Sequence, residues 1–365
     1  MHPGSLRVAL VSTPFVATPP FHYGGTELVV AELAKALRAR GVEVVVYATG
    51  DSRLEGIEVR SYFREAKWPP DPDVDRVPGA WCLRDAARDP LGFDLLHLHS
   101  VGAVEMAHLS PYPMLATLHH VPSPALSEMY LRTPSVSLVA ISRNQARAER
   151  APVSAVVQHG LDPSRFHPVH DQGYLLFLGR YDREKGAHYA IEVAHRAGMP
   201  LVMAGAPHQR DYYEHFLKPL IEKHNVFDVG PVGGDKKSAL IARARALLFP
   251  IEWEEPFGLV MIEAMLSGVP VLASGRGSVP EIIEDGITGV ICDDPSEMVA
   301  AARISEKLFD RARIRRLGEE RFSAARMAIA AMISTIFRAT QQCCARQVPV
   351  RRTIRGVLHN PAWRT

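Results

Sequence analysis

The stretch that decides the fold runs from Glu255 to Glu263 and reads Glu-Pro-Phe-Gly-Leu-Val-Met-Ile-Glu. The apolar run inside it predicts a helix that starts near Pro256, because the missing N–H of proline has no partner to lose in a first helical turn. The same helix is expected to reach Ser267, and Gly268 suits the cap beyond its end. The stretch therefore places one carboxylate before a helix and a second one inside it.

The positions of these two carboxylates suggest a ligand. Glu255 is expected on the loop before the helix, and Glu263 about two turns into it, at a rise of ~1.5 Å per residue. Gly258 has no Cβ, so a ligand can approach the backbone closely between them. Free N–H groups at a helix start attract anions, and carboxylates accept hydrogen bonds from hydroxyls. A sugar joined to a diphosphate and a ribose carries that combination of groups.

Short apolar runs alternate with helical segments along the whole chain. The strand candidates are residues 7–11, 42–47, 95–99, 114–118, 137–141, 155–158, 174–178, 201–204, 225–229, 246–249, 269–273 and 289–292. These runs are continuous, which favours parallel strands covered on both faces. Residues 26–40 predict an amphipathic helix with Thr26 as its N-cap and Gly41 at its end. Such alternation implies an α/β protein with doubly wound parallel sheets.

The alternation pauses once, at the turn-rich residues 162–173. A chain of 365 residues suits two domains. We predict an N-terminal Rossmann-like domain over residues 1–165, a C-terminal one over 171–320, and a terminal helix with a basic tail over 321–365. Ligands of such sheets bind beyond the carboxyl ends of the strands, so the two domains are expected to face a central cleft. Prolines and acids at 62–81 predict a surface loop.

The composition is that of a soluble globular protein, with 47 % hydrophobic and 22 % charged residues. The net charge of +2 gives no indication of a nucleic-acid partner, and none is expected. The charge is unevenly distributed, because eight arginines and no acid follow Glu320. Without those eight, 34 basic and 40 acidic residues remain, so residues 1–320 carry a formal charge of about −6.

The chain is expected to be cytoplasmic. Its four cysteines lack zinc spacing, which favours reduced thiols. No signal peptide precedes the first strand, and no apolar run approaches the ~20 residues that span a bilayer. The arginine-rich tail leaves two interpretations open. It contacts the anionic inner face of the membrane, at ~1 kcal/mol per basic residue, or it has no function, which is the interpretation we favour.

Two cations follow the strand at residues 174–178. Arg180 can bind phosphate oxygens through its planar fork, and Lys185 can add a point charge. Both lie at the carboxyl end of a strand, where ligands of doubly wound sheets bind. Acids interleave with them, so a solvated run of charges is the simpler interpretation of this segment alone. Combined with the segment from Glu255 to Glu263, a diphosphate site is favoured.

Two glycines, Gly24 and Gly25, precede the helix at residues 26–40. Consecutive glycines before a helix can form an anion-binding nest, although they are often only a turn. The sequence around them lacks the pattern of a nucleotide-hydrolase phosphate loop. It also lacks the Gly-x-Gly-x-x-Gly pattern, so nicotinamide binding is not indicated.

Histidines end two strands of the first domain. His119 follows the strand at residues 114–118 and could hydrogen-bond a sugar hydroxyl or a phosphate oxygen. His97 and His99 lie at i and i+2 on one face of a strand, so a metal pair is conceivable. No third ligand is evident from the spacing, and structural histidines are the simpler interpretation. No metal site is therefore predicted.

Taken in order along the chain, these residues resemble the retaining glycosyltransferases of family 4, which have the GT-B fold. The match covers most of residues 6–325. Its most specific part runs from Glu255 to Glu263 and continues through residues 268–271 and 277–281. No single motif decides the resemblance; the joint order of the motifs does.

The resemblance implies roles for five residues of the segment from Glu255 to Glu263. Glu263 is similar to the carboxylate that holds the ribose hydroxyls of the nucleotide. Glu255 is similar to the carboxylate that contacts the donor sugar near its reacting carbon. The backbone N–H groups of Phe257, Gly258 and Leu259 are expected to line the sugar and phosphate site.

The resemblance also implies roles elsewhere in the chain. Arg180 and Lys185 match the cations that bind the diphosphate. Gly24 and Gly25 match the loop that closes on the phosphates, and His119 matches a histidine that faces the donor sugar. His119, Glu255, Arg180 and Lys185 would then be the catalytic residues.

The activity that the resemblance implies is transfer of a sugar with retention of configuration. The donor is a nucleotide-diphosphate sugar, and neither a metal nor a further cofactor is expected. The acceptor is a sugar, a lipid-linked sugar or a small metabolite. Two alternatives stay open: a nucleotide-sugar epimerase or phosphorylase of the same fold, and a non-catalytic module that binds a nucleotide sugar.

Overall fold

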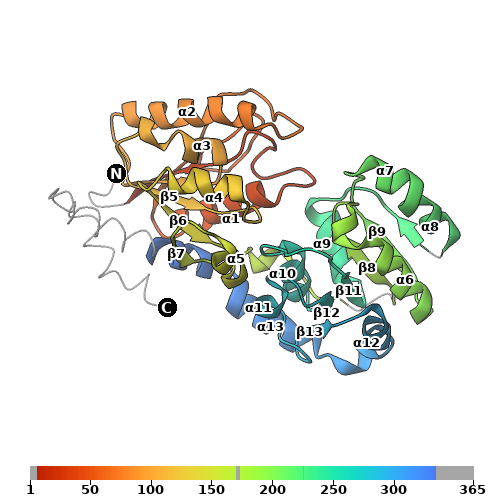
Figure 1. The fold of residues 1–365 in the computed structure, drawn as a ribbon. Helices are drawn as coiled ribbons and strands as arrows, with labels where there is room; N and C mark the ends of the chain where they lie inside the picture. The colour runs from red at the N-terminus through yellow and green to blue at the C-terminus, as the bar shows by residue number, and fades with distance from the viewer. Residues whose placement is uncertain (1–5, 170–172, 225, 334–365) are drawn as a thin grey trace. The chain divides into compact units, whose positions relative to one another are not determined.

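The computed structural model describes residues 6–169, 173–224 and 226–333, and Figure 1 shows their helices and strands. Packing divides them into two units. The first comprises the described residues up to Pro20, Gly24–Gly160 and the described residues from Ala324 onward. The second comprises Phe21–Tyr23 and Leu161–Ser323. The sequence placed the change of domain between residues 165 and 171, and in the structure it falls at Leu161.

The first unit is built around a parallel sheet of seven strands in the order β3-β2-β1-β4-β5-β6-β7. The strands are β1 (Arg7–Val11), β2 (Glu43–Tyr47), β3 (Glu58–Arg60), β4 (Leu95–Leu98), β5 (Met114–Thr117), β6 (Val136–Ala140) and β7 (Val153–Val156). Its α-helices are α1 (Gly25–Arg38), α2 (Pro72–Arg88), α3 (Val101–Glu105), α4 (Pro124–Leu131), α5 (Arg143–Ala148) and a helix over residues 324–333.

The second unit has a parallel sheet of six strands in the order β10-β9-β8-β11-β12-β13. The strands are β8 (Leu175–Leu178), β9 (Leu201–Ala204), β10 (Val226–Asp228), β11 (Ala246–Phe249), β12 (Val271–Ser274) and β13 (Gly289–Cys292). Its helices include α6 (Ala187–Ala197), α7 (Arg210–Tyr212), the π-helix η4 (Tyr213–Leu217), α8 (Lys218–Lys223), α9 (Gly234–Ala242), α10 (Leu259–Leu266), α11 (Val279–Ile282), α12 (Pro295–Leu308) and α13 (Arg311–Phe322).

The predicted doubly wound sheets are confirmed, and every predicted strand begins and ends within two residues of an observed one. The sequence missed β3, a three-residue edge strand that forms no apolar run. The loop predicted at residues 62–81 is wrong from Pro72 onward, where α2 begins. The Asp71 side chain accepts a hydrogen bond from the N–H of Asp73, so Pro72 opens a capped helix instead of extending a loop.

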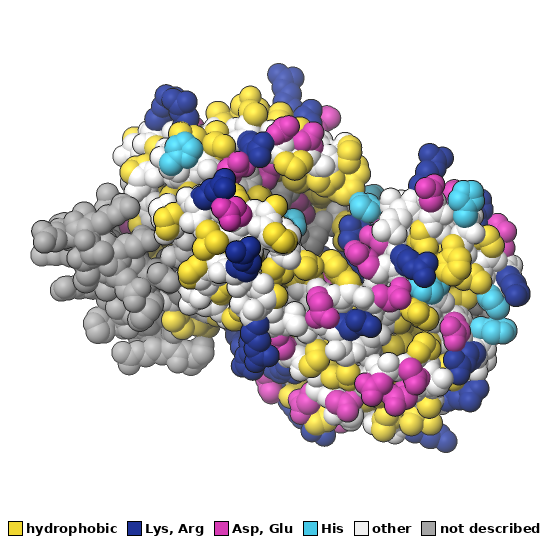
Figure 2. Space-filling model, in the orientation of Figure 1, with side chains coloured by type: hydrophobic (Ala, Val, Ile, Leu, Met, Phe, Trp, Pro, Cys, Tyr) yellow, Lys and Arg dark blue, Asp and Glu magenta, His cyan; other side chains and the backbone are white. Residues whose placement is uncertain are grey.

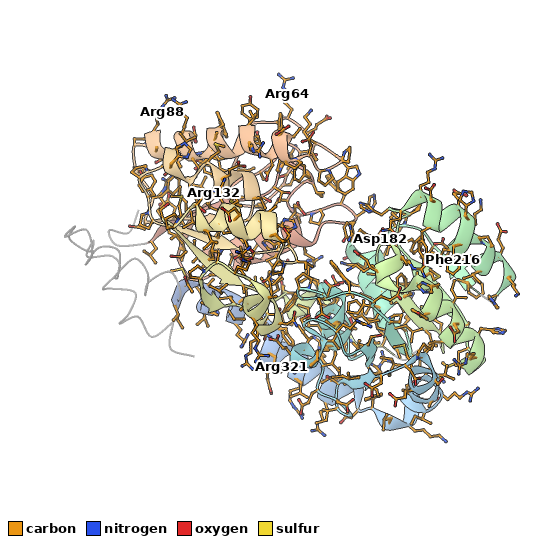
Figure 3. All side chains as sticks on the ribbon, viewed as in Figure 1. Arg64, Arg88, Arg132, Asp182, Phe216 and Arg321 are labelled. Atoms are coloured by element: carbon orange, nitrogen blue, oxygen red, sulfur yellow. The ribbon has the colours of Figure 1, made fainter. Side chains whose placement is uncertain are left out.

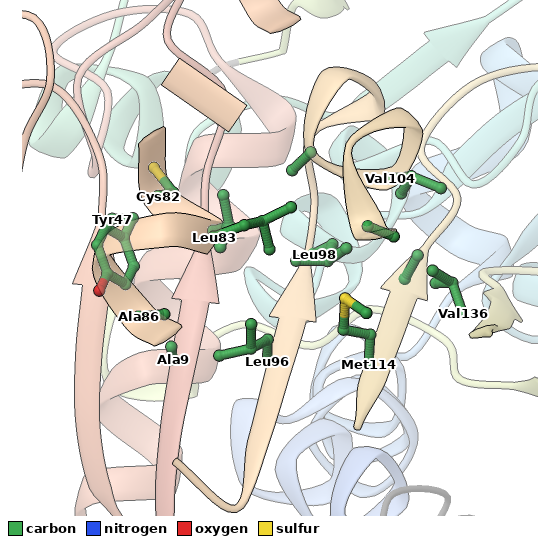
Figure 4. Packing of buried hydrophobic residues seen from close by; sticks show 14 of the residues in the cluster. Ala9, Tyr47, Cys82, Leu83, Ala86, Leu96, Leu98, Val104, Met114 and Val136 are labelled. Carbon is green, nitrogen blue, oxygen red and sulfur yellow. The ribbon is translucent and has the colours of Figure 1, made fainter. Parts of the chain in front are cut away.

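The core of the first unit lies between its sheet and the helices α2, α3 and α4. Leu83 of α2 packs there against strand residues that include Leu96, Leu98 and Met114 (Figure 4). The alternate side chains of the same strands face α1 and residues 324–333. Met327 belongs to this second layer, and its sulfur accepts the N–H of Gly160 at 3.3 Å. Six of the eight terminal arginines lie beyond residue 333, outside the described residues, so the interpretation of that tail stays open.

The strand order reverses once in each sheet. In the second unit, β9 lies on one side of β8 and β11 lies on the other, so the connections that leave β8 and β11 run in opposite directions. Two neighbouring loops that diverge at the carboxyl ends of parallel strands leave a crevice between them. The loop after β8 carries Arg180 and Lys185, and the loop after β11 carries Glu255.

A glycine at each end of α6 provides a test of how these two loops pack. Gly186 and Gly198 both adopt a left-handed backbone, with φ of 72° and 70°. A Cβ on Gly186 would lie 1.8 Å from the carbonyl oxygen of Pro250, whereas a Cβ on Gly198 would meet nothing within 4 Å. The loops after β8 and β11 therefore approach more closely than any side chain at residue 186 allows.

We predict that Gly198→Ala lowers the unfolding free energy by about 1 kcal/mol, the cost of a left-handed alanine. Gly186→Ala is expected to cost several times more, because the backbone must also move away from Pro250. Urea unfolding of each variant, followed by circular dichroism, measures the loss of unfolding free energy that each substitution causes. Equal losses in the two variants would show that the contact at Pro250 relaxes freely.

Candidate functional site

The loop after β8 forms one side of the candidate site in the second unit. Asp182, labelled in Figure 3, lies on this loop and is 2 % exposed. A short turn of 3-10 helix, η3 (Arg183–Lys185), follows it and leads through Gly186 into α6. The left-handed backbone of Gly186 ends η3, so Lys185 is held at a fixed position at the head of α6.

Lys185 and Glu255 form the central contact of the site. The Lys185 Nζ lies 2.6 Å from Glu255 Oε2, and both side chains are largely buried, at 13 % and 10 % exposure. Trp253 supports both partners: its Nε1 donates to the same Glu255 oxygen at 3.1 Å, and its ring lies 4.1 Å from the Lys185 ammonium. The carboxylate therefore has one oxygen fully engaged, with Oε1 left for another hydrogen bond.

The backbone around Glu255 is fixed by a third loop. The N–H of Ser278 donates to the Glu255 carbonyl at 2.9 Å, and the Ser278 hydroxyl donates to the Phe257 carbonyl at 2.8 Å. A Cβ on Gly277 would lie 2.3 Å from the backbone nitrogen of Glu255. The sequence segment at 277–281 thus serves to hold the loop that carries Glu255.

Helix α10 starts three residues later than the sequence predicted. Its N-cap is Gly258 in a left-handed conformation, with φ of 77°, so Pro256 lies in the loop and the helix begins at Leu259. Glu263 is consequently the fifth helical residue, a little over one turn into the helix instead of two. The predicted C-terminus is confirmed, because Gly268 has φ of 70° and its N–H donates to the Met265 carbonyl.

The second carboxylate, Glu263, is 2 % exposed and has a cation of its own. Its Oε1 pairs with the ammonium of Lys237, which lies on α9. Burial of a carboxylate costs several kcal/mol unless a cation and hydrogen bonds accompany it. Sequence analysis did not identify Lys237, because no spacing pattern joins it to Glu263 across 26 residues.

Arg180 does not contact the two glutamates directly. Its guanidinium pairs with Asp182 at 3.2 Å and with Glu184 at 3.7 Å, both on its own loop. The side chain is 25 % exposed, so it keeps access to solvent. The structure thus joins Lys185 to Glu255, places Arg180 on the same loop as Lys185, and leaves Glu263 with Lys237.

The remaining predicted residues belong to the first unit. Gly24 is the N-cap of α1 and makes no side-chain cap, so the prediction of Thr26 as N-cap is wrong. Gly25 is the first helical residue. Glu27 fills the first turn: it is 5 % exposed and accepts the Thr13 hydroxyl, and burial raises the pKa of its carboxyl group. The helix start predicted to bind phosphate therefore already contains a buried acid.

His119 lies two residues beyond β5 at the end of a row of histidines. Its Nε2 forms a hydrogen bond of 2.9 Å with Nδ1 of His99, and its ring stacks on that of His159 with centroids 5.2 Å apart. His97 is bonded instead to the hydroxyl of Thr117, at 2.7 Å. The sequence found His119, His97 and His99 but not His159, which a turn after β7 brings to the row.

The four imidazoles share one electrostatic environment. His97, His99 and His159 are each 4 % exposed. Burial lowers the pKa of His97 and of His159 to about 3. Burial, reinforced by the neighbouring imidazoles, also holds the pKa of His99 and His119 well below the usual range. All four rings are therefore neutral at pH 7, and the row is suited to hydrogen bonding and not to carrying charge.

No cluster of three or more His, Cys, Asp or Glu side chains in the described part of the chain is arranged to hold a metal ion. None of the described helices has the length and apolar character needed to cross a bilayer. On the face drawn in Figure 2, acidic and basic side chains of the second unit are interspersed. That face lacks the stripe of one sign that typifies nucleic-acid binding.

Comparison with known proteins gives two adjoining family matches. Residues 23–184 match the family described as Glycosyltransferase Family 4, and residues 162–322 match Glycosyl transferases group 1. A glycogen synthase of Mycobacterium tuberculosis is 30 % identical over 364 residues, which covers 82 % of this chain and 85 % of that protein.

Solved structures agree in fold. AviGT4, a glycosyltransferase involved in avilamycin A biosynthesis, is 26 % identical, with a TM-score of 0.74 over 92 % of this chain and 98 % of that one. Anabaena HepE, solved with UDP and glucose, is 18 % identical, with a TM-score of 0.70 over 90 % and 99 % of the two chains. The two parallel-sheet units and these neighbours confirm the predicted GT-B fold.

The chain belongs to the glycosyltransferases of the family 4 type. It is therefore a glycosyltransferase, as the resemblance implied.

The row of histidines predicts acid sensitivity of the first unit. An imidazole whose folded pKa lies below its unfolded pKa binds more protons when unfolded, so stability falls as the pH drops below about 6.5. At ~1.4 kcal/mol per pKa unit, each of His97 and His159 removes about 2 kcal/mol of unfolding free energy between pH 6.5 and pH 5.

We expect His159→Gln to reduce the difference in Tm between pH 7.5 and pH 5, whatever its effect at pH 7.5. The matched control is His167→Gln, since His167 is exposed. A His159→Gln protein with the parent's full acid-induced drop in Tm would contradict the role of burial.

Proposed function

We propose that the protein transfers a sugar from a nucleoside-diphosphate sugar to a hydroxyl acceptor, with retention of anomeric configuration and without a divalent metal. The observation that carries this proposal is the meeting of Lys185 and Glu255 at the carboxyl ends of β8 and β11. A sugar hydroxyl can donate to the open oxygen of Glu255, while cations of the neighbouring loop face the phosphates. The UDP and glucose bound to the HepE neighbour support a donor of this kind.

The leaving group determines what the residues must do. A nucleoside diphosphate is a stable anion, so its departure requires stabilisation of charge more than a strong acid. Lys185 contributes an ammonium, Arg180 a partly exposed guanidinium, and the start of α10 the N–H groups of its first two residues, Leu259 and Val260. Each well-placed donor contributes on the order of 3 kcal/mol to such a transition state.

Retention follows in this proposal from attack on the face that the diphosphate leaves. The bond between the anomeric carbon and the phosphate oxygen breaks, and its electron pair goes to the phosphate. The acceptor oxygen bonds to the anomeric carbon, and the acceptor's proton passes to the departing phosphate oxygen. A double displacement needs a free carboxylate as nucleophile, and both Glu255 and Glu263 are already paired with lysines.

A donor screen followed by analysis of the product tests the proposal. Thermal shift with a panel of nucleotide sugars identifies the donor, because ligand binding raises Tm. Release of nucleoside diphosphate with and without EDTA then tests turnover and independence of a metal. The coupling constant of the anomeric proton in the first product, measured by NMR, distinguishes retention from inversion. Binding without turnover for every acceptor class would favour a binding module instead.

We predict that Lys185→Ala lowers kcat about 100-fold, which corresponds to the loss of one charge-stabilising donor. Arg180→Ala is expected to have an effect in the same direction. Arg183→Ala is the matched control, because Arg183 is an exposed cation of the same loop whose guanidinium lies over the ring of Phe216. Initial rates at saturating donor measure the effect. Rates of the Lys185 variant within twofold of the parent would remove it from the phosphate site.

A further inference from the structure

Lys237 is the cation that the proposed function leaves unexplained. It lies on α9 four residues before Ile241, which is fully buried, so the two share the face of α9 that is turned inward. Its ammonium reaches Oε1 of Glu263 on α10. The preceding residue, Lys236, is exposed on the same helix. Only one of these adjacent lysines is therefore built into the site.

The contact with Lys237 occupies only one of the two carboxylate oxygens of Glu263. Oε1 is engaged by Lys237, and no described residue donates to Oε2. A carboxylate oxygen has two lone pairs and accepts hydrogen bonds from hydroxyls, while an ammonium has three N–H donors and can give one to a hydroxyl oxygen. The pair thus presents an acceptor and a donor side by side.

A vicinal diol matches that arrangement. One hydroxyl of a ribose can donate to Glu263 Oε2, and the oxygen of the neighbouring hydroxyl can accept from the Lys237 ammonium. A carboxylate alone would have to accept from both hydroxyls. With Oε1 already taken by a lysine, the diol is better satisfied by the two side chains together.

We propose that Lys237 is a further donor-binding residue, which recognises the ribose diol jointly with Glu263. This inference rests on the proposed function, because it requires a nucleotide at the site. In this proposal, the ion pair of Lys237 and Glu263 makes the protein bind a ribonucleotide more tightly than its deoxy analogues.

Isothermal titration calorimetry with defined nucleotides tests the assignment. The probe is whichever of UDP, ADP and GDP binds the parent most tightly, together with its 2′-deoxy and 3′-deoxy forms. In the parent, each deoxy form is expected to bind about 10-fold more weakly than the ribonucleotide. In Lys237→Met, the ribonucleotide itself is expected to bind more weakly. For one of the two deoxy forms, the ratio of its Kd to that of the ribonucleotide is expected to fall below about threefold. Lys236→Met is the matched control and keeps the parent's penalties.

If Lys237→Met fails to fold, the double variant Lys237→Met/Glu263→Gln is measured in its place. The double variant removes both charges of the pair, so no unpaired carboxylate is buried. It is expected to bind the three nucleotide forms equally, and Lys237→Arg is expected to restore part of the discrimination.

Three results would overturn the assignment. If Lys237→Met keeps the parent's affinity and penalties, the lysine has no part in binding. If it weakens all three forms by the same factor, Lys237 acts on the phosphates and not on the diol. In both cases the proposed function stands. A parent that binds none of the three ribonucleotides would instead overturn the proposed function and this inference together.

Discussion

The site of the second unit depends on one ion pair, between Lys185 and Glu255. It joins the loops that leave β8 and β11, the two neighbouring strands where the order of the sheet reverses. A backbone bond from the N–H of Glu252 to the Glu184 carbonyl, at 2.8 Å, ties the same loops a few residues away. The left-handed Gly258 and the start of α10 follow this junction directly along the chain.

The second carboxylate, Glu263, is also paired with a lysine. Glu255 and Glu263 are both buried, and each is accompanied by a lysine from a different element of the unit. A buried pair of this kind is costly to assemble and contributes little net stability. Its benefit is geometric: the carboxylates are already desolvated and aimed before a ligand arrives, so binding need not supply that cost. A site preorganised in this way favours polar ligands with several hydroxyl groups.

Sequence reasoning predicted the elements well because parallel strands carry continuous apolar runs, which stand out even in short segments. It failed where the decisive information was local backbone geometry. The order of residues did not show that Gly258 would be left-handed and delay α10. The pair Asp71-Pro72 is an N-cap followed by proline, a signal for a helix start that was interpreted as part of a loop. The site was found to the extent that its residues follow strands. Lys185 and Glu255 do, whereas Lys237 lies inside α9 and reaches Glu263 only through the packing of α9 and α10.

The first unit contains a different kind of side-chain cluster. Its row of imidazoles is neutral at pH 7 because burial lowers the pKa of every member. His119 is bonded through Nε2 to His99, so only Nδ1 is left for a ligand. A neutral ring with a strongly lowered pKa is a poor acceptor of a full proton, but it exchanges hydrogen bonds with a hydroxyl. In the proposed reaction, the base that takes the acceptor's proton is the departing phosphate, which the mechanism itself supplies.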